Sequence, residues 1–296
     1  IASPMTYGQR LAVYGLFFLA GFSALGNEVL WTRHLSLIVE NSVYTYTTTL
    51  TLVLIGMVFG SIIAATFFDR IRYHAMTFGF VQALSGLAVL VALLIPQSWW
   101  GGWIDSKDFQ LMFRACAVIL LIPAVLSGAA FPLAIRMVVE DPREAGASVG
   151  RMTAVNTLGG IVGSLLVGFF LMPVLGIQTT LYVVTGVSVV SGAIAWLLLE
   201  RQRMLLLRAG MAAVACILWF WIPQQLKTQL PADFLSANGV LLEYREGLAS
   251  NMAVIYSGQS RQLEINRLPQ GFDHKNHQIM VAHVPSLLHP GPESVL

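Results

Sequence analysis

The sequence predicts an all-α polytopic membrane domain of about seven transmembrane helices, followed by a small antiparallel β segment and the start of an α/β domain. The composition predicts the membrane part, because 56% of the 296 residues are hydrophobic and 11% are charged, against roughly 25% charged in soluble domains. The charges are bunched, which leaves apolar stretches of about 18 residues or more, long enough to cross a bilayer. After Gly239, short apolar runs between turn residues predict the β part.

Seven apolar runs predict the individual spans. The first run is too long for a cleaved signal peptide and is interpreted as a retained helix. The last run has an apolar core of only about 14 residues, so it could instead lie in the membrane interface. The predicted spans are 11–31, 43–68, 76–95, 111–139, 155–174, 180–199 and 205–222.

The basic residues predict the orientation of these spans. If the N-terminus is cytoplasmic, nine arginines fall on the inner side and four basic residues on the outer side, as the positive-inside rule requires. We therefore expect a multi-pass protein of a bacterial inner membrane, with its C-terminal domain on the outer, periplasmic side. The inner arginines are Arg10, Arg70, Arg72, Arg136, Arg143, Arg151, Arg201, Arg203 and Arg208.

Small residues at a spacing of four predict where helices pack together. Gly56 and Gly60 form one such pair, and Gly159 and Gly163 form another. Small residues let two helix backbones approach closely in a membrane. We interpret both pairs as packing sites and not as chemistry.

The C-terminal part is predicted to differ from the membrane domain of residues 1–225. A linker at 226–239 leads to residues 240–296, which form an incomplete β-hairpin region. Strands are predicted at 240–247, 251–258 and 261–266, with turns at Gly247, Gly258 and Asn266. An amphipathic helix is predicted at 277–288.

Glu28, Arg33 and Asn156 are candidates for a polar role within the membrane. Glu28 is the acidic residue that lies well inside a run, and burying it costs roughly 2.5–3.5 kcal/mol on insertion scales. Its candidate partners are Arg33, His34 and Asn156. Glu28 could belong to an ion or substrate relay, but a structural polar clamp is preferred.

Several functional classes are set aside. A net charge of +2, with the basic residues in short loops, argues against nucleic-acid binding. His274 and His277 have a spacing that could share a metal ion on a helix, but no cysteine is near, so we expect no metal site. No glycine-rich phosphate loop, nucleophile elbow or paired-carboxylate motif occurs, so we expect no catalytic residue in this chain.

Three motifs stand out in the membrane part, at 21–33 (GFSALGNEVLWTR), 126–133 (LSGAAFPL) and 150–159 (GRMTAVNTLG). On these motifs the chain resembles the bacterial proteins that fuse a transporter-like membrane domain to a spermidine synthase. The resemblance continues through 244–247 (YREG), 263–266 (LEIN) and 282–290 (AHVPSLLHP). Phe68–Arg72 is similar to the acidic-basic loop of major facilitator transporters.

The resemblance implies a membrane-integrated spermidine-synthase-like protein, of which this chain holds the membrane anchor and the non-catalytic start of the synthase-like domain. It implies substrate contacts for Gln270 and His277. It also implies decarboxylated S-adenosylmethionine as cosubstrate of a complete family member, although the chain itself is expected to hold no cofactor.

Two other functions stay open. The chain could be a non-enzymatic accessory subunit whose glycine-rich helices pack against other membrane subunits. It could also be a transporter of polyamines or small solutes, although seven spans without an internal repeat are few for such a carrier.

Overall fold

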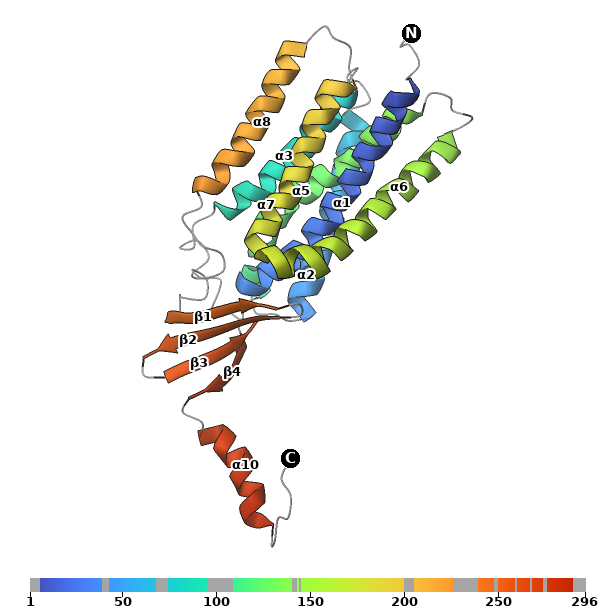
Figure 1. The fold of residues 1–296 in the computed structure, drawn as a ribbon. Helices are drawn as coiled ribbons and strands as arrows, with labels where there is room; N and C mark the ends of the chain where they lie inside the picture. The colour runs from blue at the N-terminus through green and yellow to red at the C-terminus, as the bar shows by residue number, and fades with distance from the viewer. Residues whose placement is uncertain are drawn as a thin grey trace.

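The computed structural model describes residues 6–38, 43–67, 74–94, 109–139, 143, 145–199, 205–225, 239–247, 250–258, 260–266, 268–273 and 276–289. A bundle of long helices is followed by a small sheet and a final helix (Figure 1). The bundle helices are α1 (Tyr7–Ile38), α2 (Val43–Phe67), α3 (His74–Leu93), α5 (Phe109–Val138), α6 (Ala145–Leu166), α7 (Met172–Leu198) and α8 (Leu205–Gln225).

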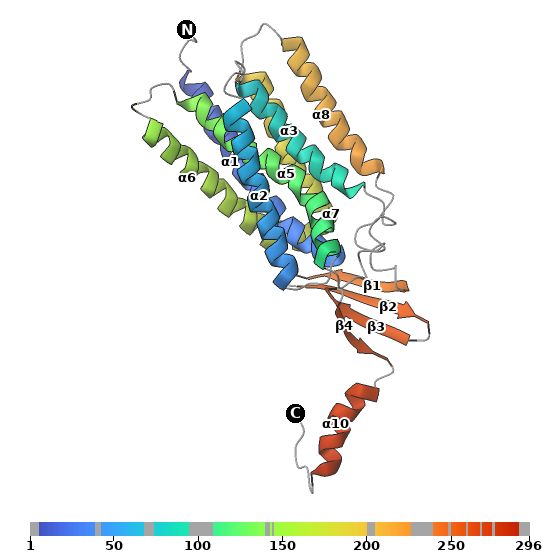
Figure 2. The same ribbon diagram turned by 180° about the vertical axis from the view of Figure 1, so that it is seen from behind.

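Six of the helical segments in the described residues are long and apolar enough to cross a membrane, judged by length and composition. This count differs from the seven predicted spans, because 155–174 and 180–199 are two arms of one helical segment, Ala145–Leu198. A π-helical stretch, η3 (Val167–Leu171), joins α6 to α7. Gly176 then interrupts α7 with φ 78° and ψ 167°, and the chain turns back along the bundle (Figures 1 and 2).

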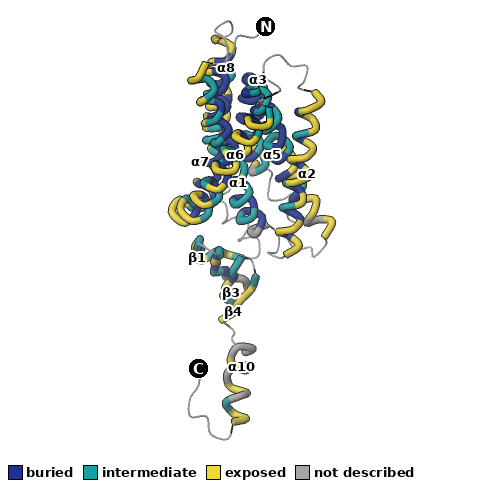
Figure 3. Tube along the Cα trace, turned by 90° about the vertical axis from the view of Figure 1, so that its right-hand side faces the viewer, coloured by how far each residue is buried: buried dark blue, intermediate teal, exposed yellow. Residues whose placement is uncertain are grey.

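The outside of the bundle is apolar. On α2, for example, Leu54, Val58 and Ile62 are more than half exposed, and exposed residues run along the outer helix faces in Figure 3. Helices that are apolar on all sides are typical of membrane spans, whereas helices on the surface of a soluble protein carry a polar outer face.

Two apolar cores lie one above the other inside the bundle. The first contains Leu30, Leu35 and Ile177, and the second contains Val13, Phe17 and Met152. On α1 the second core ends at Ala20 and the first begins at Leu30, with the buried polar residues Ser23 and Asn27 between them. The middle of the bundle is therefore polar, and the layers on either side of it are apolar.

The glycine pairs lie at the closest helix contacts. A Cβ atom on Gly60 of α2 would come within 1.9 Å of the Val125 carbonyl oxygen of α5. A Cβ atom on Gly159 of α6 would come within 2.0 Å of the Phe18 carbonyl oxygen of α1. Gly56 and Gly163 pack in the same way against α5 and α1, respectively. No larger residue fits these contacts without separating the helices.

The α8 helix lies alongside α7 and not across the end of the bundle (Figure 1). Ala212 and Ala215 belong to a buried cluster with Trp196 of α7. The indole Nε1 of Trp219 donates hydrogen bonds of 3.3 Å to the Tyr182 carbonyl oxygen and to Thr185 Oγ1. This packing favours a spanning helix over the alternative of an interfacial one.

The C-terminal part is an antiparallel sheet of four strands in sequential order, followed by α10 (Asn276–Leu288). The strands are β1 (Val240–Glu246), β2 (Asn251–Ser257), β3 (Ser260–Ile265) and β4 (Leu268–Phe272). The first three strands and α10 agree with the predicted elements. The sequence pattern does not predict β4, which contains Pro269 and Gly271, two residue types that strands tolerate chiefly at a sheet edge.

Candidate functional site

The first strand of the sheet is attached to the end of the helix bundle. The N-terminus lies at the opposite end of the bundle from the sheet (Figures 1 and 2). A carboxylate oxygen of Glu246, Oε2, accepts a 2.7 Å hydrogen bond from the backbone N–H of Ile177 in α7. Arg33, near the end of α1, donates a hydrogen bond to the Gly247 carbonyl oxygen. Two bundle helices therefore hold the end of β1.

The kink in α7 explains why Glu246 is needed there. Gly176 breaks the helix, so the Ile177 N–H begins a new helical arm and lacks the partner that an unbroken helix would provide. A carboxylate at a helix N-terminus satisfies such a donor and interacts favourably with the helix dipole. Glu246 thus caps the second arm of α7 from another part of the chain.

A β-bulge in β1 aims Tyr244 and Glu246 at the bundle. The register between β1 and β2 shifts between Leu241 and Glu243. The shift lets Leu241 and Tyr244 pack against the same buried residues of β2, although they are three positions apart. Glu246, two residues after Tyr244, lies on the same face, and the Tyr244 hydroxyl donates a 3.2 Å hydrogen bond to Glu246 Oε1.

The environment of Tyr244 keeps its hydroxyl neutral. Burial raises the pKa of the Tyr244 phenol well above its usual value, and the Glu246 carboxylate raises it further by charge repulsion and by accepting the hydroxyl proton's hydrogen bond. The Arg33 guanidinium opposes this shift. The three side chains therefore form one electrostatic unit at the junction, the cluster Arg33–Tyr244–Glu246.

No hydrogen bond or ion pair is found between Glu28 and its candidate partner Arg33 within the part of the chain that the structure describes. Arg33 donates a hydrogen bond to Gly247 in the sheet, and the Glu28 carboxylate has no partner among the described residues. The backbone carbonyl of Glu28 accepts a hydrogen bond from Thr32 Oγ1 at 2.9 Å. Asn156 and His34, the other expected partners, lie against Gly21 and Trp31, respectively.

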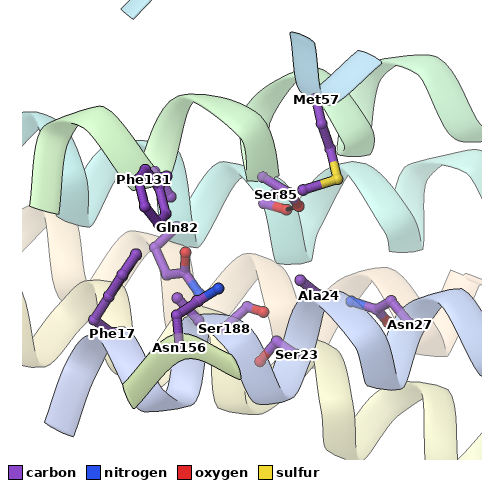
Figure 4. A pocket seen from close by; sticks show the side chains of 13 residues that line it. Phe17, Ser23, Ala24, Asn27, Met57, Gln82, Ser85, Phe131, Asn156 and Ser188 are labelled. Atoms are coloured by element: carbon purple, nitrogen blue, oxygen red, sulfur yellow. Dashed lines mark hydrogen bonds between the residues drawn. The ribbon is translucent and has the colours of Figure 1, made fainter. Parts of the chain in front are cut away.

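Asn156 instead lines a polar cavity in the middle of the bundle (Figure 4). The cavity lies between the two apolar cores, and the side chains around it come from six helices. Its polar lining consists of three amides and four hydroxyls, those of Asn27, Gln82 and Asn156 and of Ser23, Ser85, Ser127 and Ser188. Sequence reasoning found only Asn156. The amides of Asn27 and Gln82, each inside an apolar run, were the signal that could have revealed the rest.

The two residues expected to contact substrate lie in the C-terminal part. Gln270 is exposed on β4, and His277 lies in the first turn of α10. The side chain of His277 lies outside the described residues. The acidic-basic loop Phe68–Arg72 and His274 lie outside them too.

We compared the chain with known proteins. It is 30% identical over 221 residues to polyamine aminopropyltransferase 1 of Streptomyces coelicolor, a match that covers 73% of this chain and 40% of that protein. It is 28% identical over 225 residues to polyamine aminopropyltransferase 2 of the same organism, with 71% and 39% covered. The chain thus spans about 40% of the length of these relatives. No family model matches it.

These similarities support the synthase-like part of the resemblance. They do not bear on the likeness to major facilitator transporters. A match of 221 residues is too long to lie outside the helices, which extend to Gln225 in a chain of 296 residues. The match therefore includes much of the helical part of the chain.

Proposed function

We propose that this chain is the membrane-integrated part of a polyamine aminopropyltransferase, with the sheet as the start of its synthase-like unit. The similarity to two polyamine aminopropyltransferases, which includes much of the helical part, carries this proposal. The six long apolar helices and the apolar outside of the bundle support the membrane location.

In this proposal the bundle is more than a tether. A flexible tether would need no contacts between the bundle and the sheet, whereas Glu246 caps a bundle helix and Arg33 binds the end of β1. These two contacts orient the sheet relative to the bundle. The substrate-contacting surface would then face a fixed direction, which suits an enzyme that works at a membrane surface.

The proposed reaction is the transfer of an aminopropyl group from decarboxylated S-adenosylmethionine to a diamine. The amine nitrogen forms a bond to the terminal carbon of the aminopropyl group as the carbon–sulfur bond breaks. Methylthioadenosine leaves with the electron pair, and the new secondary amine loses a proton. Gln270, exposed on β4, is the described residue for which the family resemblance implies a substrate contact.

The experiment uses permeabilised membrane vesicles that contain the full-length protein. They receive decarboxylated S-adenosylmethionine with a labelled aminopropyl group, together with putrescine. We expect labelled spermidine, with about tenfold less product from Gln270→Ala, because a substrate contact is typically worth one to two kcal/mol. Gln224→Ala, at an exposed glutamine at the end of α8, is the control and should keep full activity. Vesicles that form no spermidine, despite a folded protein, would overturn the proposal.

A second candidate function is that of a non-enzymatic subunit of a membrane complex, and the distribution of arginines favours it. Arg10, Arg136, Arg151 and Arg208 lie at helix ends on the side of the N-terminus, away from the sheet. The positive-inside rule then puts the sheet on the outer face of a bacterial inner membrane. Decarboxylated S-adenosylmethionine is made in the cytoplasm, so this orientation separates the sheet from that cosubstrate.

The two candidates differ in one observable result. The enzyme should produce spermidine once vesicles are permeabilised, whichever way the protein faces. The subunit should produce none under any condition.

A further inference from the structure

The cavity in the middle of the bundle contains polar groups that the protein itself does not satisfy. Among the described residues, the Ser23 hydroxyl oxygen and Asn27 Oδ1 are buried and have no hydrogen-bond partner. The amides of Gln82 and Asn156 also make no hydrogen bond within the described residues, although Gln82 is only 4% exposed. Buried polar groups in folded proteins nearly always have a partner, either protein or solvent. The residues around the cavity therefore carry polar groups whose hydrogen-bonding capacity the protein does not use.

The backbone holds these groups in place around the cavity. A Cβ atom on Gly21 would come within 2.1 Å of the Asn156 carbonyl oxygen, so α1 and α6 are in direct contact where the cavity begins. On the other side, Ser85 of α3 and Ser127 of α5 are joined by a 3.3 Å hydrogen bond between their hydroxyls. The polar side chains converge on one space in Figure 4. The site is thus built from close helix contacts and not from a loop.

The lack of charge in the lining determines which class of solute can bind. None of the described residues that line the cavity is acidic or basic. Glu28, next to Asn27 in the sequence, is not one of them. A cation placed here would lose its hydration without gaining a counter-charge, which strongly disfavours binding inside an apolar bundle. Amides and hydroxyls both donate and accept hydrogen bonds, so they suit an uncharged polar molecule.

The volume of the cavity limits the size of the solute. About 50 Å³ is open to the centres of water-sized molecules. A single water needs about 10–15 Å³ by this measure, so the space holds a few waters or a solute of about four non-hydrogen atoms. A polyamine is too long and too highly charged to be enclosed here.

We propose that this mid-bundle cavity is a binding site for a small uncharged solute of the amide or polyol class, held by Asn27, Gln82 and Asn156. Its position between two apolar cores puts it halfway along the helices, where membrane proteins commonly place solute sites. The site does not involve the sheet or aminopropyl transfer. The binding proposal can therefore be tested separately from the proposed enzyme activity.

The test is ligand-observed nuclear magnetic resonance on the full chain in lipid nanodiscs, with acetamide as the neutral probe and ethylammonium as the cationic one. A solute this small binds with a dissociation constant no tighter than about tens of micromolar, which suits saturation-transfer measurements. We expect saturable binding of acetamide and at least tenfold weaker binding of ethylammonium. Asn27→Leu and Gln82→Leu should each weaken acetamide binding at least tenfold.

Ser61→Ala is the matched control, because Ser61 is a polar residue of α2 that already bonds to the Gly128 carbonyl oxygen outside the cavity. It should leave acetamide binding unchanged. If a leucine variant fails to fold, Asn156→Ala and Ser188→Ala test the same lining with smaller changes. The proposal is overturned if acetamide shows no saturable binding, which would mean that the cavity holds water alone. Equal binding of ethylammonium, or unchanged binding in folded cavity variants, would overturn it too.

Discussion

Glu246 Oε2 accepts a 2.7 Å hydrogen bond from the Ile177 backbone N–H, and so the first strand of the sheet caps a broken helix of the bundle. This contact joins residues 69 positions apart in the chain. The sheet and the second arm of α7 therefore stabilise each other. A substitution that weakens one of them should also lower the stability of the other.

The first prediction concerns the cap itself. Glu246→Ala should lower the free energy of unfolding by about 1–3 kcal/mol, because it removes a charged acceptor from a helix N-terminus and from the Tyr244 hydroxyl. Thermal melting of the detergent-solubilised protein measures the change. Glu243→Ala is the control on the same strand, since Glu243 makes only an exposed ion pair with Arg245. Such pairs contribute about 0–1 kcal/mol. Equal losses in the two variants would contradict the capping role.

The second prediction concerns the kink. Gly176 has φ 78° and ψ 167°, a region of backbone conformation that is essentially restricted to glycine. Gly176→Ala should cost about 1–3 kcal/mol. Its Cβ atom would also lie 3.2 Å from Glu246 Oε2, so the cap should be disturbed as well. Chemical denaturation measures the loss, and in the Glu246→Ala background the cost of Gly176→Ala should be smaller. Additive costs would show that the kink and the cap are independent.

The third prediction tests the contact between α1 and α6. Gly159→Ala places a Cβ atom 2.0 Å from the Phe18 carbonyl oxygen, so the helices must separate, at a cost of about 1–3 kcal/mol. Gly150→Ala, on the same helix, meets nothing within 4 Å and should be neutral or stabilising by up to about 1 kcal/mol. Melting temperatures that fall for Gly159→Ala and do not fall for Gly150→Ala are the expected result. An unchanged melting temperature in Gly159→Ala would refute the close contact between α1 and α6.

The fourth prediction concerns pH. The pKa of Tyr244 is raised in the folded protein, whereas in the unfolded chain a tyrosine titrates near pH 10. The stability contributed by the neutral phenol is therefore complete below about pH 10 and is lost as the pH rises above that value. Stability should fall more steeply between about pH 9 and 11 in the native protein than in Tyr244→Phe. If the stability of the two proteins fell equally with pH, the pKa of Tyr244 would not be raised in the folded state.

Composition and periodicity were sufficient to predict the helices, the first three strands and α10, because each depends on local patterns. They could not show that two predicted spans form one bent segment, since the bend depends on the backbone of Gly176 and on a cap from Glu246. The sequence pattern places Glu246 in a predicted strand and does not single out Gly176, so it gives no sign of their contact.

The partners of polar and small residues were harder to predict than the residues themselves. The spacing of Gly159 and Gly163 predicts a close contact but does not say that the partner is α1. Arg33 was one of three candidate partners for Glu28. The structure joins Arg33 to Gly247, because the end of α1 lies next to the end of β1.

The central claim is that the bundle crosses a membrane and holds the N-terminus and the sheet on opposite sides. Cysteine accessibility in intact cells tests it most directly, using the full chain with Cys116 and Cys216 replaced by alanine. Single cysteines are then introduced as Tyr7→Cys, at a residue 84% exposed near the N-terminus, and as Arg261→Cys, on an exposed position of β3. A membrane-impermeant maleimide should label position 261 in intact cells and position 7 only after permeabilisation. Labelling of both positions on the same side would contradict the account.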